Sequence, residues 1–238
     1  MTLDVNGWID GITASGVVIF GLIFGIFFYY RSRKLGAKFL AHLSLANVFA
    51  GLMFLGVFID FLFVLFFQRN IVNNGIVAIL SYIWFAPVII TAMYIGAELL
   101  TPKIKRYILF LFIVISIFFE VIIFSFPLES FNFIPEPPLI PSKNLIDYNV
   151  NLITVAGILM GGLLLSVIVF LGLGFMIKGL KSSGIIRRNF LLISIGSIFF
   201  CIFGLLEGLT VPGLFVILVR VGYLSSFWFM YFGLQTKE

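Results

Sequence analysis

Five ionisable residues lie within long apolar runs, and their types define the chemistry open to this sequence. A charge at the centre of a bilayer costs roughly 2.5–3.5 kcal/mol on insertion scales, so such side chains face the interior of a helix bundle and find partners there. Carboxylates and a guanidinium in this setting form ion pairs, exchange protons or bind small charged ligands. The five residues are Asp60, Glu98, Glu120, Glu207 and Arg220.

The stretch LLEGLTVPGLFVILVRVGYL, residues 205–224, carries Glu207 and Arg220 on the two limbs of a tight turn. The helical rise places Glu207 about 5 Å and Arg220 about 11 Å below that turn. Side chains lean toward the N-terminus of their helix, so the two groups point toward the same depth. The sequence therefore predicts an ion pair between them.

Two further carboxylates are expected near the same depth. The same count puts Glu120 about 9 Å and Asp60 about 11 Å below the outer ends of their helices. Three carboxylates facing one guanidinium require a proton, water or an external cation, which predicts an outer-half pocket for a small ligand or cation. Tyr223 lies on the same helix face as Arg220. In the alternative interpretation, Glu207 and Arg220 only join two helices, and the other two acids reach interfacial water.

The third apolar run carries a polar stripe at helical spacing that ends in Glu98. Pro87 and Tyr94 lie on this stripe, and Pro87 predicts a kink that serves either packing or a hinge. The basic segment TPKIKR follows directly. We expect Glu98 to form an ion pair with this segment at the inner interface.

These residues must be positioned by membrane-spanning helices, because 62% of the 238 residues are hydrophobic and 11% are charged. Apolar runs of at least 18 residues occur seven times, each long enough to cross a bilayer. The sequence predicts one all-α integral membrane domain over residues 1–238, a seven-transmembrane-helix bundle with spans at about 8–30, 39–67, 76–100, 107–126, 150–177, 189–209 and 212–234.

Positive charge alternates between the connections. The loops RSRKLGAK, TPKIKR and KGLKSSGIIRR hold most of the lysine and arginine, whereas the other connections contain only Arg69 and Lys143. This pattern predicts an outer N-terminus and a cytoplasmic C-terminus in a multi-pass protein of the cell membrane. It also explains the net charge of +5 without nucleic acid. The N-terminus lacks a basic region, so we expect the first span to be retained. The long outer loop, 127–149, is expected to be a lid or a stiff spacer.

Catalytic and cofactor signatures are not found in the sequence. His42 and Cys201 are single residues of their kinds, so haem and zinc ligand sets are not expected. The sequence contains no GxSxG, HExxH or phosphate-loop motif, and the last span has no lysine for a retinal Schiff base. We therefore expect neither an enzyme nor a cofactor.

Three segments resemble the seven-helix sensor region of archaeal and bacterial histidine kinases: GLMFLGVFIDFLF, WFAPVIITAMYIG and IIRRNFLLISIG. The resemblance implies a sensor or receptor-like membrane protein. Because no kinase is attached, it also implies a separate cytoplasmic signalling partner. A small secondary transporter is the alternative, since SLANVF and SIGSIF suggest a three-plus-one-plus-three repeat in which Asp60, Glu120 or Glu207 carries a proton or sodium ion. A structural subunit of a membrane complex is a third interpretation.

Overall fold

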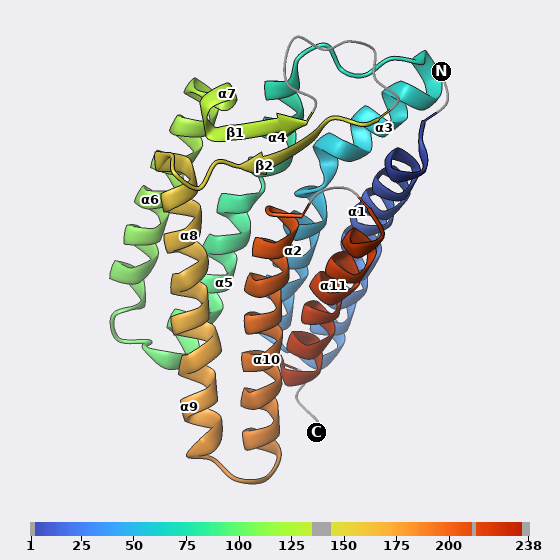
Figure 1. Ribbon diagram of the computed structural model, residues 1–238. Coiled ribbons are helices and arrows are strands. Elements are labelled where there is room, and N and C mark those ends of the chain that lie inside the picture. The colour runs from blue at the N-terminus through green and yellow to red at the C-terminus, as the bar shows by residue number, and fades with distance from the viewer. Residues whose placement is uncertain (1–2, 135–143, 211–212, 235–238) are drawn as a thin grey trace.

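Long helices running side by side form the body of the protein, and a two-stranded hairpin crosses one end of them (Figure 1). The computed structural model describes residues 3–134, 144–210 and 213–234. Residues 135–143, the proline-rich part of the segment 127–149, and residues 211–212 lie outside this description. The elements in chain order are α1 (Val5–Leu35), α2 (Lys38–Leu52), α3 (Leu55–Phe67), α4 (Asn74–Tyr82), α5 (Phe85–Leu100), α6 (Lys105–Ser125), α7 (Pro127–Ser130), β1 (Phe131–Ile134), β2 (Asp147–Val150), α8 (Val155–Val167), the π-helix η1 (Ile168–Leu173), α9 (Gly174–Leu180), α10 (Gly184–Glu207) and α11 (Leu214–Leu234).

Six helical stretches among the described residues are long and apolar enough to cross a membrane, and a bent pair of helices raises the number to seven. They support the predicted multi-pass, mainly α-helical membrane protein. The six stretches are Val5–Leu35, Gly75–Leu100, Lys105–Ser125, Val155–Leu180, Gly184–Glu207 and Leu214–Leu234.

The bent pair corrects the predicted continuous helix over residues 39–67. Helices α2 and α3 meet at 44° around Met53 and Phe54. Beyond the break, the Gly56 amide donates a hydrogen bond to the Ser81 hydroxyl at 2.9 Å. A side chain of α4 thus accepts a hydrogen bond from a backbone amide at the start of α3. A Cβ on Gly56 would lie 1.9 Å from the Val77 carbonyl oxygen, and only glycine permits this close approach.

A second interruption separates α4 from α5 at Ile83 and Trp84. Pro87 lies one turn beyond it and has no amide to bond the Ile83 carbonyl, which explains why the regular α-helix is interrupted there. The fifth span also departs from regular α-helix, because η1 lies between α8 and α9. Three neighbouring spans therefore contain irregular turns.

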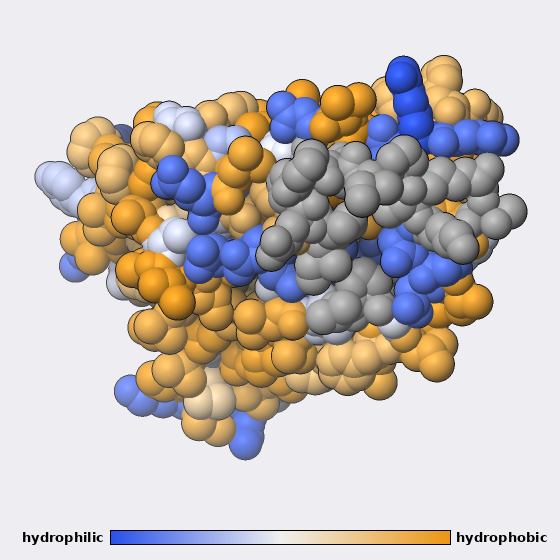
Figure 2. All heavy atoms as spheres, turned by 45° about the horizontal axis from the view of Figure 1, so that its top comes forward, coloured by the Kyte–Doolittle hydropathy of each residue, from blue (hydrophilic) through white to orange (hydrophobic). Residues whose placement is uncertain are grey.

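The two ends of the bundle differ in charge and cover. One end carries the three lysine- and arginine-rich connections at 31–38, 101–106 and 178–188, and we call it the basic end. The opposite end carries β1 and β2, and we call it the hairpin end (Figure 1). Figure 2 shows hydrophilic residues gathered at the hairpin end above a flank that is mostly hydrophobic.

The hairpin is held to the bundle by apolar packing. Its strands are antiparallel, with Phe131 opposite Val150 and Phe133 opposite Tyr148. All four of these side chains are buried, as is Ile146 just before β2. The described part of the segment 127–149 is therefore a folded cover over the helices.

Candidate functional site

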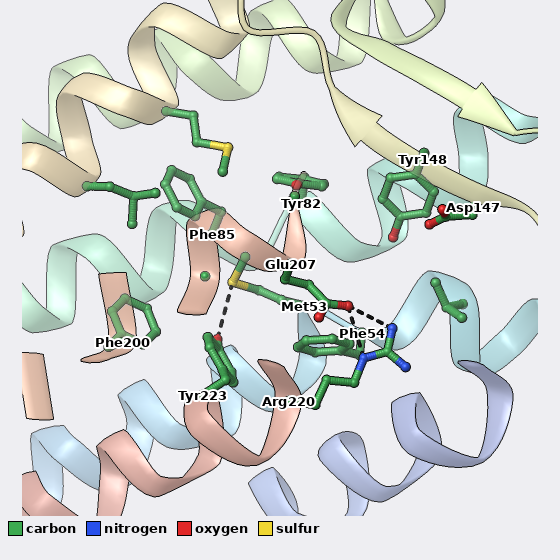
Figure 3. A pocket seen from close by; sticks show the side chains of 15 residues that line it. Met53, Phe54, Tyr82, Phe85, Asp147, Tyr148, Phe200, Glu207, Arg220 and Tyr223 are labelled. Carbon is green, nitrogen blue, oxygen red and sulfur yellow. Dashed lines mark hydrogen bonds and ion pairs between the residues drawn. The ribbon is translucent and has the colours of Figure 1, made fainter. Parts of the chain in front are cut away.

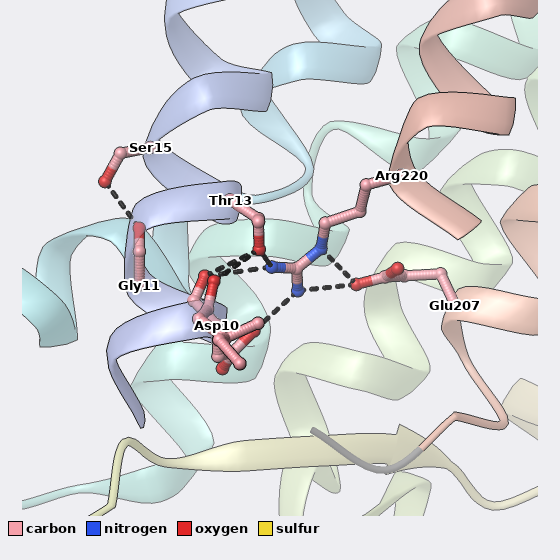
Figure 4. A network of polar contacts seen from close by, with 7 residues as sticks. Asp10, Gly11, Thr13, Ser15, Glu207 and Arg220 are labelled. Carbon is pink, nitrogen blue, oxygen red and sulfur yellow. Dashed lines mark hydrogen bonds and ion pairs between the residues drawn. The ribbon is translucent and has the colours of Figure 1, made fainter. Parts of the chain in front are cut away.

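An ion pair between Glu207 and Arg220 lies at the hairpin end of the last two helices, as the sequence predicts. The Nε and Nη2 atoms of Arg220 donate to Oε1 of Glu207 at 3.0 and 2.7 Å. Arg220 is only 5% exposed, although it lies in a helix that has a largely exposed apolar face. Both side chains converge from adjacent helices in Figure 4.

Helix α1 supplies two partners of Arg220 that sequence reasoning missed (Figure 4). Nη2 of Arg220 pairs with Oδ1 of Asp10 at 2.7 Å, and Nη1 donates to the Asp10 carbonyl oxygen at 2.9 Å. Nη1 also donates to the Thr13 hydroxyl. Asp10 and Thr13 are three residues apart and face one side of the helix, a spacing that could have been read as a polar stripe inside the first apolar run.

These contacts occupy the whole hydrogen-bonding capacity of Arg220. A guanidinium has five N–H donors, and the structure gives each of them an acceptor: Glu207 Oε1 twice, Asp10 Oδ1, the Asp10 carbonyl and Thr13 Oγ1. The guanidinium carbon also lies 5.1 Å from the centre of the Phe54 ring. Arg220 therefore fixes α1, α10 and α11 together and has no donor left for a further acceptor.

Asp60 does not join this network, contrary to the expected convergence on Arg220. Its Oδ2 accepts from Asn70 Nδ2 and from the Ile146 amide, both at 2.9 Å, and its Oδ1 accepts from the Ile71 amide at 2.8 Å. The side chain is completely buried. Asp60 thus ties the α3–α4 connection to the segment that leads into β2.

Glu120 also lies elsewhere, in an open groove between α5 and α6. Pro87 and Ser116 line the same groove. Neither carboxylate oxygen of Glu120 has a hydrogen-bond partner among the described residues, and the same holds for the Ser116 hydroxyl. Of the three carboxylates expected near Arg220, only Glu207 contacts it.

The remaining predicted residues fall into two places. Tyr223 lies beside the Arg220 network and donates to the Ala50 carbonyl at 3.3 Å. At the basic end, Glu98 pairs with Lys105 Nζ at 2.5 Å, as expected for an interfacial ion pair. The same ammonium lies 4.4 Å from the centre of the Tyr94 ring, and Tyr94 stacks on His42.

A cavity lies between the Arg220 network and the hairpin (Figure 3). The cavity has a volume of about 60 Å³, which is enough for several water molecules or part of a small ligand. Its polar lining includes Asp147, Glu207 and Arg220. Six aromatic rings form much of the remaining wall: Phe54, Tyr82, Phe85, Tyr148, Phe200 and Tyr223.

Asp147, at the first position of β2, was not among the predicted site residues. Burial raises the pKa of its carboxyl to about 7, with a further contribution from the negative charge of Asp10, while the Tyr148 amide opposes the rise. Its Oδ2 is buried and has no hydrogen-bond partner in the described parts of the chain. The sequence offered no signal for it, because only the folded hairpin brings this loop residue over the helices.

The cavity lies where two spans are interrupted. Met53 and Phe54 form the break between α2 and α3, and both line it. Tyr82 and Phe85 flank the break between α4 and α5, and they line it as well. The cavity therefore contacts the segments whose helical packing is least regular.

Comparison with protein-family models, curated proteins and solved structures finds no match for this chain. Its class is therefore defined by its own architecture, a helical multi-pass membrane protein with a hairpin-covered cavity. Among the described residues, no group of histidine, cysteine, aspartate and glutamate side chains could hold a metal ion.

Proposed function

We propose that this protein is a seven-span membrane sensor of receptor type, whose cavity binds a small ligand or cation at the outer face. In this proposal the hairpin end faces the outside and the basic end faces the cytoplasm, because positive loops are retained on the cytoplasmic side. The basic loops then contact a separate cytoplasmic signalling protein.

The observation that carries the proposal is the contrast between the cavity and the packing beyond it. Toward the basic end, the next hollow is a pocket of about 20 Å³, and every residue that lines it except Ser197 is apolar. Phe200 of α10 lines both hollows, and on α11 Phe227 of the second hollow lies one turn beyond Tyr223 of the first. Phe227, Leu43 and Leu171 are all buried in this layer. Apolar closure supports a ligand that enters and leaves on one side, as in a sensor.

A signal would travel through the interrupted helices. A ligand in the cavity contacts Met53, Phe54 and Tyr82, at the breaks of the second and third spans. Packed helices have discrete arrangements, so a ligand that favours one geometry at a break shifts the helix ends beyond it. Pro87 lies in the third span and η1 in the fifth, and both allow bending between the cavity and the basic end.

A small cation-coupled transporter is the second candidate. Buried carboxylate oxygens without hydrogen-bond partners among the described residues favour it, because protons and sodium ions are carried on such groups. They belong to Asp10, Glu120, Asp147 and Glu207.

Filling the cavity from the protein itself tests the sensor proposal. Gly204 lines the cavity, and a Cβ at this position meets only a carbon of Tyr223 at 3.8 Å, so Gly204→Leu places a side chain where a ligand would bind. Spin labels on cysteines replacing Lys38 and Lys181 report the basic end, in a Cys201→Ala background that removes the native thiol. We expect Gly204→Leu to shift the distance distribution between the labels.

The matched control is Gly162→Leu, since nothing lies within 4 Å of a Cβ at Gly162 and this position is exposed on α8. It should leave the distribution unchanged. An unchanged distribution in folded Gly204→Leu protein would contradict the sensor proposal. Proteoliposomes separate the second candidate: sodium and proton uptake equal to that of empty liposomes is expected for a sensor, and faster uptake that Gly204→Leu abolishes would establish transport.

A further inference from the structure

We infer that the ligand of the cavity is a protonated amine with an apolar body, whose ammonium group donates hydrogen bonds to Asp147 and Glu207. The inference rests on the proposed function, because it names the ligand class for the same cavity. It depends on which hydrogen-bonding groups of the cavity wall are already satisfied.

Arg220 does not recruit an anionic ligand. It is the one cationic side chain among the described residues that line the cavity, but all five of its N–H donors have acceptors within the protein. A carboxylate or phosphate ligand would have to displace Asp10 or Glu207 from it. Displacement would leave a buried carboxylate without its cation, which is strongly unfavourable.

The unsatisfied groups at this site are acceptors. Oδ2 of Asp147 and Oε2 of Glu207 are buried without a hydrogen-bond partner in the described parts of the chain, and Oδ2 of Asp10 behind them is in the same state. A buried acceptor without a donor is costly, so the site favours a molecule that brings N–H or O–H groups. With all groups ionised, three carboxylates face one guanidinium, and this charge favours a cation.

The rest of the wall suits the apolar part of such a cation. Tyr82, Phe85, Tyr148 and Phe200 present aromatic rings around the cavity (Figure 3). Met160 also lines the cavity and adds a flexible thioether. Aromatic faces attract ammonium groups, and they also make favourable contacts with hydrocarbon groups. An organic cation uses both properties of the wall, its charge and its apolar area.

A bare metal cation uses the wall less well. Calcium takes six to eight oxygen ligands, and magnesium needs near-ideal octahedral oxygen geometry. The described residues contain no cluster of metal-binding side chains, and most of the residues that line the cavity beside the two carboxylates are aromatic or aliphatic. The chemistry of the lining therefore selects an amine over an inorganic ion.

Calorimetric titration with matched pairs of small molecules tests this inference on the purified full-length protein in lipid nanodiscs. The pairs are 2-phenylethylamine with 2-phenylethanol, and butylamine with butanol, which differ in one charged group. We expect at least one amine to bind roughly tenfold or more tightly than its alcohol, since a hydrogen bond to a charged partner is worth that factor or more. Gly204→Leu should abolish this binding.

Two variants assign the carboxylate. Asp147→Asn should weaken amine binding about tenfold while leaving alcohol binding unchanged, because it removes the charge and keeps the size. Glu129→Gln is the matched control, since Glu129 is an exposed carboxylate at the same end of the molecule. Loss of amine binding in both variants alike would contradict the assignment.

Three results of these titrations would overturn the amine inference, and a fourth would come from inorganic salts. These are an alcohol that binds as tightly as its amine, amine binding that persists in Gly204→Leu, and no binding by either amine. None of these results tests the sensor proposal, because that proposal is tested by the spin-label distances in Gly204→Leu without added ligand. Chloride salts of sodium and calcium are titrated in parallel, and binding of either ion in place of the amines would also overturn the inference.

Discussion

At the scale of single residues, Arg220 determines the character of the site. A buried guanidinium is stable only when acceptors surround it, and here two helices, α1 and α10, supply them. Because these acceptors use every donor, the ion pair organises the wall and leaves ligand contacts to the carboxylates. The sequence predicted the contact with Glu207 from the tight turn between them. The contact with Asp10 could not be predicted, since it joins residues 210 positions apart.

Replacing Arg220 should destabilise the protein strongly. Arg220→Ala leaves the carboxylates of Asp10 and Glu207 buried without a cation, and removal of one partner of a buried pair costs about 3–5 kcal/mol. Reversible unfolding in mixed micelles measures the change. Arg69→Ala is the control, because Arg69 is exposed, and it should have an effect within about 0.5 kcal/mol. Equal stabilities for the two variants would contradict the network described here.

Amine binding should strengthen as the pH rises from 6 to 8. The carboxyl of Asp147 has a pKa of about 7, so it loses its proton in this range, whereas an alkyl amine with a pKa of ~10.4 stays protonated. The charged groups that act on Asp147 are Asp10 and Glu207, which raise its pKa, and Arg220, which lowers it. Titrations at both pH values measure the effect. In Asp147→Asn the dependence should flatten, and an equally steep profile there would assign it to another group.

At the scale of elements, the interrupted spans and the hairpin are the features that position the site. The apolar runs predicted where helices occur, because membrane helices require long stretches without charge. They could not predict the break at Met53, since the Ser81 hydroxyl that accepts a hydrogen bond from the Gly56 amide belongs to another span. The hairpin was likewise not predicted, because its strands flank a proline-rich segment and the whole of residues 127–149 reads as an irregular loop.

Asp60 should control the attachment of the hairpin. Asp60→Asn replaces one acceptor oxygen with a donor that faces an amide or the Asn70 side chain, so at least one of its three hydrogen bonds is lost at a cost of about 1.5–3 kcal/mol. Hydrogen exchange should accelerate at Ile146 and Ile71. Glu129→Gln, at the same end of the molecule, should leave both amides protected. Unchanged exchange in Asp60→Asn would show that apolar packing alone holds the hairpin.

At the scale of the whole molecule, charge and cover divide the protein into two unlike ends. The hairpin end contains the cavity and its acids, and the basic end contains three clusters of lysine and arginine. Composition and loop charge predicted a multi-pass helical protein, and the structure agrees at that level. The cavity itself depends on which faces of different helices meet, and the linear pattern of one sequence does not specify this.

The orientation in the membrane is a prediction that labelling can check. Single cysteines replacing Lys181 and Glu129, in a Cys201→Ala background, lie at the basic end and the hairpin end. In intact cells a membrane-impermeant maleimide should label only the cysteine at position 129, because the positive loops remain in the cytoplasm. Labelling of only position 181 would reverse the topology and place the cavity on the cytoplasmic side.

A sensor with an amine ligand requires that an amine in the cavity changes the packing at the basic end. Its most direct test is the distance distribution between spin labels at positions 38 and 181, measured with and without saturating 2-phenylethylamine. The amine should shift the distribution in the same direction as Gly204→Leu, and 2-phenylethanol at the same concentration should not. An amine that binds in the cavity and leaves the distribution unmoved would contradict it.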